Sequence, residues 1–225
     1  MKKIAKRKTP SKWGIHNLSQ NEIAYDSVKE KIVALAYKPG LYLNIAEMMN
    51  ELSLGRTPIN HALHRLSREG LLQIIPRKGV VVAPLSIDEA LELIDVRIVN
   101  EKLCAHLAAE KITAAELEQL AGLLEQQDAA IAANEVELAA SFDLGFHEEI
   151  AKASRNQVLI EILRVIHARA QRFWVISFRT EGHLKEIQSE HRLILDALGR
   201  ADPEATAAAM EAHALSFKCS LLRTY

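Results

Sequence analysis

The chain has 225 residues, which is enough for one large domain or two small ones. Its net charge of −1 conceals two unlike parts: residues 1–80 hold 14 Lys or Arg against 6 Asp or Glu (+8), and residues 81–225 hold 14 against 23 (−9). Only the first part attracts polyanions. Cys104 and Cys219 show no CxxC spacing, which argues against a disulfide framework or a cysteine metal site and predicts two small core residues.

Residues 1–19 predict a basic, flexible arm, because the first twenty residues carry six Lys or Arg and no acid. The opening MKKIAKRKTPSKW has the positive charge of a signal peptide, but no apolar stretch follows it. No later run reaches the length needed to span a membrane. We therefore expect a cytoplasmic protein with no membrane partner.

Apolar residues at helical spacing predict three helices in the first part of the chain, at Gln20–Tyr37, Ile45–Leu52 and Thr57–Glu69. Asn44 is a favourable cap for the second helix, Pro58 suits the first turn of the third, and Gly70 ends it.

Two short β-runs, Leu71–Ile75 and Val80–Ala83, flank a turn over residues 76–79 and predict a hairpin. Three helices followed by a hairpin is the order of a winged helix-turn-helix domain, which we expect over residues 20–84.

Residues 85–225 show no further strand pattern and predict an all-helical bundle of about six helices. The helices are expected to begin near Ile87 and Ala114 and to occupy Glu135–Ala153, Gln157–Phe178, Leu184–Leu198 and Pro203–Leu222. Ser86 with Glu89 and Thr113 with Glu116 have capping-box spacing, and Asp202 is suited to cap the last helix. The predicted fold class is mainly α.

The third helix has the pattern of a DNA recognition helix. Its apolar positions leave Arg56, Thr57 and Asn60 exposed at the N-terminal end, which is the end that contacts base edges and phosphates. Arginine suits bidentate bonding to guanine and asparagine suits adenine. His61 and His64 are expected to be ordinary surface or interface residues.

The tip of the predicted hairpin carries Arg77, Lys78 and Gly79, two cations and a residue that lets backbone approach a groove. The alternative for the whole domain is a winged helix that contacts another protein, with these arginines on a solvated face. The basic arm, the recognition helix and the hairpin together favour DNA.

A candidate metal site lies in the second part of the chain. Asp143 and His147 are four apart and share one face of a helix, while His191 and His213 occupy inward-leaning positions of later helices. Three His and one Asp suit zinc, and also manganese, nickel or iron(II) in a larger shell. Each histidine taken alone is more often a hydrogen-bonded residue than a ligand. His16, His106, His167 and His183 do not fit the pattern and are left out of the predicted site.

Residues GRTPINHALHRLSREGLL and IIPRKGVVV resemble the recognition helix and wing of the GntR family of regulators. The resemblance covers roughly Tyr25 to Pro84 and implies a winged helix-turn-helix that binds DNA. Asn60 stands where the family usually has Arg, and Ala46 where many members have a basic residue. These departures imply a different or weaker DNA preference.

Residues FDLGFHEEI and the later stretch through His213 resemble the FCD effector domain of the FadR subfamily, over about Leu85 to Leu222. The resemblance implies that Asp143, His147, His191 and His213 are metal ligands and that the metal lies beside a cavity for a small organic acid. It also implies that Arg97 pairs with the acid's carboxylate. Asn156 is expected to supply an amide to the effector or, alternatively, to cap a helix.

Together these patterns predict a ligand-responsive transcription regulator that binds a palindromic DNA operator as a homodimer and is not an enzyme. One alternative is a metal-dependent hydrolase or lyase. It lacks a general base, because Glu148 and Glu190 adjoin predicted ligands and should point to another helix face. Another alternative is a regulator that senses the metal ion itself. Arg169 and Arg172 are either effector contacts or exposed residues.

Overall fold

Three helices form the N-terminal domain in the computed structural model, which describes residues 19–177 and 183–224: α1 (Gln20–Val33), α2 (Ile45–Leu52) and α3 (Arg56–Arg68). Their buried faces meet in one core, in which Val28, Ile59 and Leu66 are fully covered. Asn44 caps α2 as predicted, since its side-chain oxygen accepts from the amides of Ala46 and Glu47. The helix-turn-helix expected from the sequence is confirmed.

A three-stranded antiparallel sheet completes this domain, with the order β1-β3-β2. The predicted hairpin is present as β2 (Leu72–Ile75) and β3 (Gly79–Val82). Strand β1 (Tyr42–Leu43) was not predicted, and it pairs with the outer edge of β3 through Val80 and Val81. A two-residue strand shows no alternation, so nothing in its own sequence distinguishes it from a loop.

Helix α1 ends four residues earlier than predicted. Ala34 closes it, and Leu35 takes a left-handed backbone conformation with φ of 59°. The Leu35 side chain packs against the core of the helical bundle and not against the N-terminal domain. The apolar periodicity therefore continues past the helix end because Leu35 belongs to a second core.

Six helices form the bundle, as expected: α4 (Ile87–Ala109), α5 (Ala114–Ala132), α6 (Val136–Ala153), α7 (Gln157–Ser177), α8 (His183–Gly199) and α9 (Pro203–Thr224). The predicted Thr113 capping box is confirmed, and Asp202 accepts from the amide of Ala205 at the start of α9. The predicted capping box of Ser86 is wrong. Ser86 makes no side-chain cap, and Glu89 is instead held by Arg169 at 2.6 Å.

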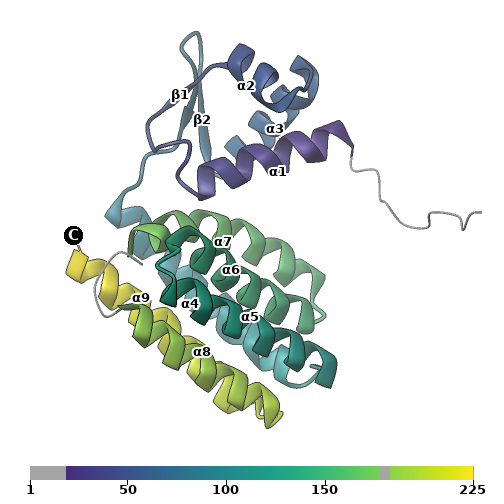
Figure 1. Ribbon diagram of the computed structural model, residues 1–225, viewed down its shortest axis with the longest axis vertical. Coiled ribbons are helices and arrows are strands. Elements are labelled where there is room, and N and C mark those ends of the chain that lie inside the picture. The colour runs from purple at the N-terminus through teal and green to yellow at the C-terminus, as the bar shows by residue number, and fades with distance from the viewer. Residues whose placement is uncertain (1–18, 178–182, 225) are drawn as a thin grey trace, which may run out of the picture.

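Helix α7 joins the two domains. Figure 1 shows the N-terminal domain lying on one side of the bundle, with α1 crossing over α7. Ala168 of α7 is part of the N-terminal core. The next turn reaches two further points of the same domain. Arg172 donates to the carbonyl of Ala83, just after β3, and a Cβ at Gly70, just after α3, would lie 3.3 Å from the Arg169 Nε.

The predictions for the N-terminal arm, for membrane-spanning helices and for the two cysteines have different outcomes. Residues 1–18 of the predicted arm lie outside the described residues, and Ser19 caps α1 through its hydroxyl. None of the helices in the described ranges is long and apolar enough to cross a membrane. Cys104 is buried as expected, but Cys219 is exposed and is not a core residue.

Candidate metal centre and nucleic-acid interface

Three buried histidines meet at the centre of the bundle. His147 comes from α6, His191 from α8 and His213 from α9, and each offers a ring nitrogen within 4.8 Å of the other two. The rings of His191 and His213 lie 4.7 Å apart between centroids. The sequence could not show this convergence, which depends on the packing of three helices.

Each of these rings has an oxygen partner on its Nδ1 atom. Glu190 Oε2 lies 2.9 Å from the Nδ1 of His213, Gln127 Oε1 lies 3.0 Å from that of His191, and Glu101 Oε1 lies 3.5 Å from that of His147. Oxygen acceptors at Nδ1 place the ring proton there and leave the Nε2 lone pair available.

The inner edge of the histidine cluster has too few hydrogen-bond partners. The Nε2 atoms of His147 and His191 are buried, and neither makes a hydrogen bond to any described residue. A buried imidazole nitrogen without a partner is costly, and a cation would satisfy both atoms at once. The arrangement therefore fits a divalent metal ion held by Nε2 atoms, and the outer oxygens would orient the rings.

Asp143 lies beside this triad. Its Oδ1 is 3.4 Å from His191 Nε2 and accepts a hydrogen bond of 3.2 Å from Gln127 Nε2. Burial raises the pKa of the Asp143 carboxyl to about 6. A divalent cation at the same place would reverse this shift and hold the carboxylate ionised.

Burial also sets the charge of the histidines. It lowers the pKa of His147 and of His191 well below the ordinary value, because a charged ring would have to leave water. Both rings are therefore neutral near pH 7. Neutral imidazole is the form that binds a metal ion.

A second buried group adjoins the triad, built from Arg97, Glu101 and His167. Glu101 Oε1 accepts from Arg97 Nε at 3.1 Å and lies 2.6 Å from His167 Nε2. Burial opposes ionisation of Glu101, but the charge of the Arg97 guanidinium and the contacts with His147 and His167 outweigh it and hold the pKa of this carboxyl well below the usual range. This carboxylate is an anion that connects Arg97 to the rings of His147 and His167.

Glu101, His147 and His167 also have the spacing of a metal-binding group. The Arg97 guanidinium bonds directly to the carboxylate oxygen that such a metal would need. A second divalent ion would lie against this fixed positive charge, which disfavours it. The His147, His191 and His213 group is the better candidate.

The predicted DNA contacts gather at one end of α3. Arg56 and Thr57 are exposed and Asn60 is half-buried. A groove of about 360 Å³ lies along this face, lined by Thr57, Asn60, His61, His64 and Arg68. His61 and His64, expected to be ordinary surface or interface residues, lie on the same face as the predicted contacts.

The hairpin tip presents its cations away from the domain. Arg77, Lys78 and Gly79 are all exposed. Arg77 and Gly79 have positive φ, 63° and 116°, as a tight reversal between β2 and β3 requires. The tip thus projects two cations beyond the sheet, the shape of a wing.

Two family models match this chain. The FCD domain matches residues 92–216, and the bacterial regulatory proteins of the gntR family match residues 20–82. The chain is a GntR-family regulator with an FCD domain. Both resemblances expected from the sequence are confirmed.

Two HTH-type transcriptional regulators resemble this chain over most of its length. The HTH-type transcriptional repressor RspR of Escherichia coli is 26% identical over 193 residues, which cover 86% of this chain and 85% of that protein. The transcriptional regulator YdhC of Bacillus subtilis is 25% identical over 191 residues, 84% and 85% of the two chains. These relatives are transcription regulators, not enzymes.

A solved structure shares the fold. E. coli McbR/YncC superposes with a TM-score of 0.84 at 22% identity, covering 92% of this chain and 99% of that one. This similarity supports the two-domain architecture described above.

Sequence reasoning on this GntR regulator missed three residues of the site. Glu101 is not part of the predicted site, His167 does not fit the predicted ligand pattern, and Glu190 is expected to point to another helix face. Glu190 instead reaches His213 on the neighbouring helix. The i,i+4 spacing of Arg97 and Glu101 was a usable signal for an ion pair, whereas the other two contacts depend on tertiary packing.

Asn156 lies at a corner of the bundle, apart from the triad. Its side-chain oxygen accepts from the amide of Leu159 and caps α7. His167, which contacts Glu101, is eleven residues further along, or about 16 Å along the helix axis. The structure therefore supports the capping role and does not bring Asn156 together with Arg97.

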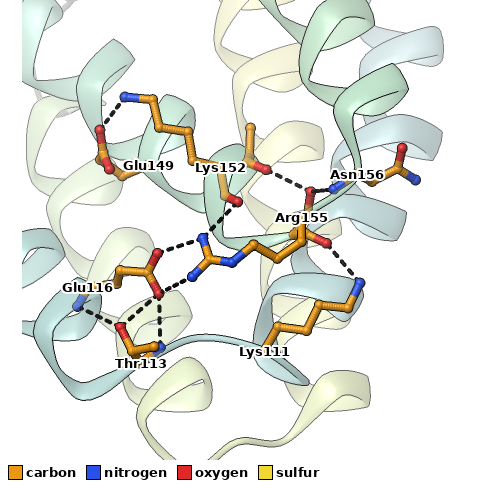
Figure 2. A network of polar contacts seen from close by, with 9 residues as sticks. Lys111, Thr113, Glu116, Glu149, Lys152, Arg155 and Asn156 are labelled. Carbon is orange, nitrogen blue, oxygen red and sulfur yellow. Dashed lines mark hydrogen bonds and ion pairs between the residues drawn. The ribbon is translucent and has the colours of Figure 1, made fainter.

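Figure 2 shows what surrounds this corner. Arg155 reaches across to Glu116, with N···O distances of 2.7 and 2.9 Å, and also donates to the carbonyl of Lys152. Lys111 donates to the carbonyl of Ser154 at 2.8 Å. These contacts tie the start of α5 to the loop between α6 and α7.

Proposed function

We propose that this regulator binds a divalent metal ion in its FCD domain, senses a small carboxylic acid there, and responds by changing its affinity for DNA. One observation carries the proposal: the Nε2 atoms of His147 and His191 are buried without a hydrogen bond to any described residue. On its Nδ1 side, His147 is joined to the buried guanidinium of Arg97 through the carboxylate of Glu101. Unsatisfied buried donors and lone pairs in one place are typical of a ligand site.

Asp143, His147, His191 and His213 are the proposed metal ligands. Three imidazoles and a carboxylate are a donor set typical of zinc, and manganese, nickel or iron(II) would require additional ligands. The ion would supply a Lewis-acid position that binds an anionic oxygen. Arg97 would bind the same anion through its terminal nitrogens.

Helix α7 is the proposed connection between the effector and DNA. His167 contacts Glu101 inside the bundle, whereas Arg169 and Arg172 contact the N-terminal domain at Gly70 and Ala83. Gly70 ends the recognition helix, and Ala83 follows the wing. A shift of α7 on effector binding would therefore act on both DNA-contacting elements together.

Arg56, Thr57 and Asn60 are the proposed base and phosphate contacts of α3, and Arg77, Lys78 and Gly79 those of the wing. One such domain covers little DNA, so we propose a homodimer on a palindromic operator, acting in the cytoplasm where the chromosome lies. Linkage then requires the acid to bind one conformation of the dimer better than the other.

The experiment uses full-length protein in metal-stripped and metal-loaded forms, with DNA selected from a random pool. We expect salt-dependent binding whose affinity shifts on adding a carboxylic acid only when metal is present. A shift produced by metal alone would identify a metal sensor instead. Absence of DNA binding even at low salt would contradict the proposal.

A further inference from the structure

A groove of about 540 Å³ lies between the two domains, where α1 faces the helical bundle. Its apolar lining comes from both domains: Val33 and Ala34 belong to α1, and Leu138 and Leu144 belong to α6. Helix α7 contributes Gln171. Figure 1 shows α1 passing over this side of the bundle. A groove of this volume accepts a small organic molecule.

This interdomain groove is separate from the histidine cluster. Ser141, which lines the groove, precedes Asp143 by two residues. In a helix this spacing puts the two side chains on nearly opposite sides of α6. Asp143 faces the bundle interior and is 2% exposed, whereas Ser141 is exposed. A ligand in the groove therefore requires neither the metal ion nor the acid.

The lining of the groove has a negative formal charge. Its carboxylates are those of Asp26, Glu30 and Glu137, and its only cation among the described residues is Lys29, which gives a formal charge of −2. Lys29 is itself attracted by the carboxylates of Glu148 and Asp26. Asp26, Glu30 and Glu137 are all exposed and thus accessible to a ligand. The groove therefore attracts cations and repels anions.

Gln171 provides a second, independent indication of a ligand. This side chain is 5% exposed, and its Nε2 donates to the carbonyl of Ala140 at 3.2 Å. That bond fixes which end of the amide is the nitrogen. The other end, Oε1, is buried and makes no hydrogen bond to any described residue. A buried amide oxygen without a partner requires a hydrogen-bond donor.

We infer that the interdomain groove binds an organic amine with a hydrocarbon body. Its ammonium group donates to Gln171 Oε1 and is attracted by the carboxylates of the lining, Glu30 among them. Its hydrocarbon body packs against the apolar side chains of Val33 and Leu144. A carboxylic acid fails on both counts, because it would be repelled by the lining and brings no donor to Gln171 when ionised.

Occupation of this groove should affect DNA binding. The opposite face of α1 packs against the recognition helix: Val28 and Ile32 share one core with Ile59 and Leu63 of α3. An amine that contacts α1, α6 and α7 together holds this domain in one position on the bundle. If DNA requires a different position, the amine and DNA change each other's affinity by the same factor.

The test is titration calorimetry on full-length protein, with and without metal, using probes that differ in the head group. Phenethylamine and hexylamine are compared with 2-phenylethanol and 1-hexanol and with 3-phenylpropionate and heptanoate. We expect at least one amine to bind about tenfold more tightly than its alcohol and its acid, with or without metal. Phenethyltrimethylammonium, which keeps the charge but has no N–H donor, should bind about fivefold more weakly than phenethylamine.

Two variants test the location. Ala34→Phe places a bulky ring in the groove, and Ala129→Phe adds the same ring at an exposed position of α5 outside it. We expect only Ala34→Phe to weaken amine binding, by about tenfold or more. Glu30→Gln removes one carboxylate of the lining and should weaken it about threefold, whereas Glu118→Gln, on exposed α5, should not.

The outcomes separate the parts of the inference. Failure of every amine to bind, or equal binding of amine, alcohol and acid, overturns it and leaves the proposals for metal and acid intact. Equal binding of the trimethylated probe removes Gln171 from the site. Amine binding that survives Ala34→Phe excludes the groove, and amine binding without effect on DNA affinity overturns the coupling. The comparison of probes on wild-type protein decides the ligand class even if a variant does not fold.

Discussion

His167 and Ala168 are adjacent in α7, but His167 is buried in the helical bundle and Ala168 is buried in the core of the N-terminal domain. His167 contacts Glu101 within 2.6 Å inside the helical bundle, and Ala168 packs among the apolar residues of the N-terminal domain. Any rotation or translation of α7 that moves one of these residues also moves the other. The two interiors therefore share one rigid element.

This arrangement predicts that the contacts of α7 can be weakened without affecting the effector site. Arg172→Met removes the hydrogen bond to the carbonyl of Ala83. We expect acid and metal affinities to stay within about threefold of wild type, while the effect of the acid on DNA affinity falls at least fivefold. Parallel titrations of acid and DNA measure this.

Arg192→Met is the control for this variant, because Arg192 pairs with Asp128 on the bundle surface. It should keep the full effect of the acid. If Arg172→Met kept that effect as well, communication between the domains would have to follow another route.

Metal loading should raise the stability of the protein. A cation that binds only the folded state at 100 times its Kd stabilises it by about 2.7 kcal/mol, which for a chain of this size raises Tm by about 5 to 10 °C. His191→Asn should abolish this rise and the bound metal measured by mass spectrometry.

His106→Ala supplies the comparison, because His106 is partly exposed and pairs only with acids on the surface among the described residues. It should keep both the metal and the thermal shift. Retention of a full equivalent of metal by His191→Asn would remove His191 from the site.

The DNA contacts should separate into two kinds. Asn60→Ala should weaken binding to the preferred sequence by about 1 to 3 kcal/mol and relax its selectivity, because an amide contacts a base edge. Lys78→Ala should weaken binding to all sequences alike and reduce the slope of log K against log salt by about one. Titrations at several salt concentrations on selected and scrambled DNA distinguish them, and identical behaviour of the two variants would contradict the assignment.

Glu116 should contribute to stability in a pH-dependent way. Its ion pair with Arg155 and the hydrogen bonds from Thr113 lower its pKa to about 2, against about 4.3 in an unfolded chain. The stabilisation is therefore complete above about pH 4.3 and disappears as the pH falls toward 2. Solvent screening at this surface site reduces it to about 1 kcal/mol.

Glu116→Gln should thus lower the urea midpoint at pH 6 but have little effect near pH 2.5. Glu125→Gln, on an exposed position of the same helix, should change neither value appreciably. An equal loss at both pH values for Glu116→Gln would assign the effect to packing instead of charge.

Much of the fold follows from local sequence. The cap of Asn44, the box of Thr113 with Glu116 and the stop at Gly70 act over three or four residues, so the chain itself determines where those helices begin and end. Predictions failed where a distant residue competed. Glu89 pairs with Arg169 and does not form the predicted capping box, and Leu35 lies beyond the end of α1 and packs against the bundle core.

The candidate metal site likewise has a part that local sequence predicts and a part that depends on tertiary packing. Asp143 and His147 share a helix, so their spacing alone places them on one face. That His191 and His213 meet them was suggested by resemblance to a family and required the packing of α8 and α9 to describe. Glu101, His167 and Glu190 contact ring atoms across helix boundaries, and no local pattern reports such contacts.

The proposed ligands come from α6, α8 and α9, and the oxygens that orient them come from α4, α5 and α8. No two consecutive helices hold enough of the site to retain an ion by themselves. The complete ligand set therefore exists only in the folded bundle, and an unfolded chain has no comparable site. Metal loss and loss of the packed bundle are thus coupled, so a chelator should lower the stability of this domain as it removes the ion.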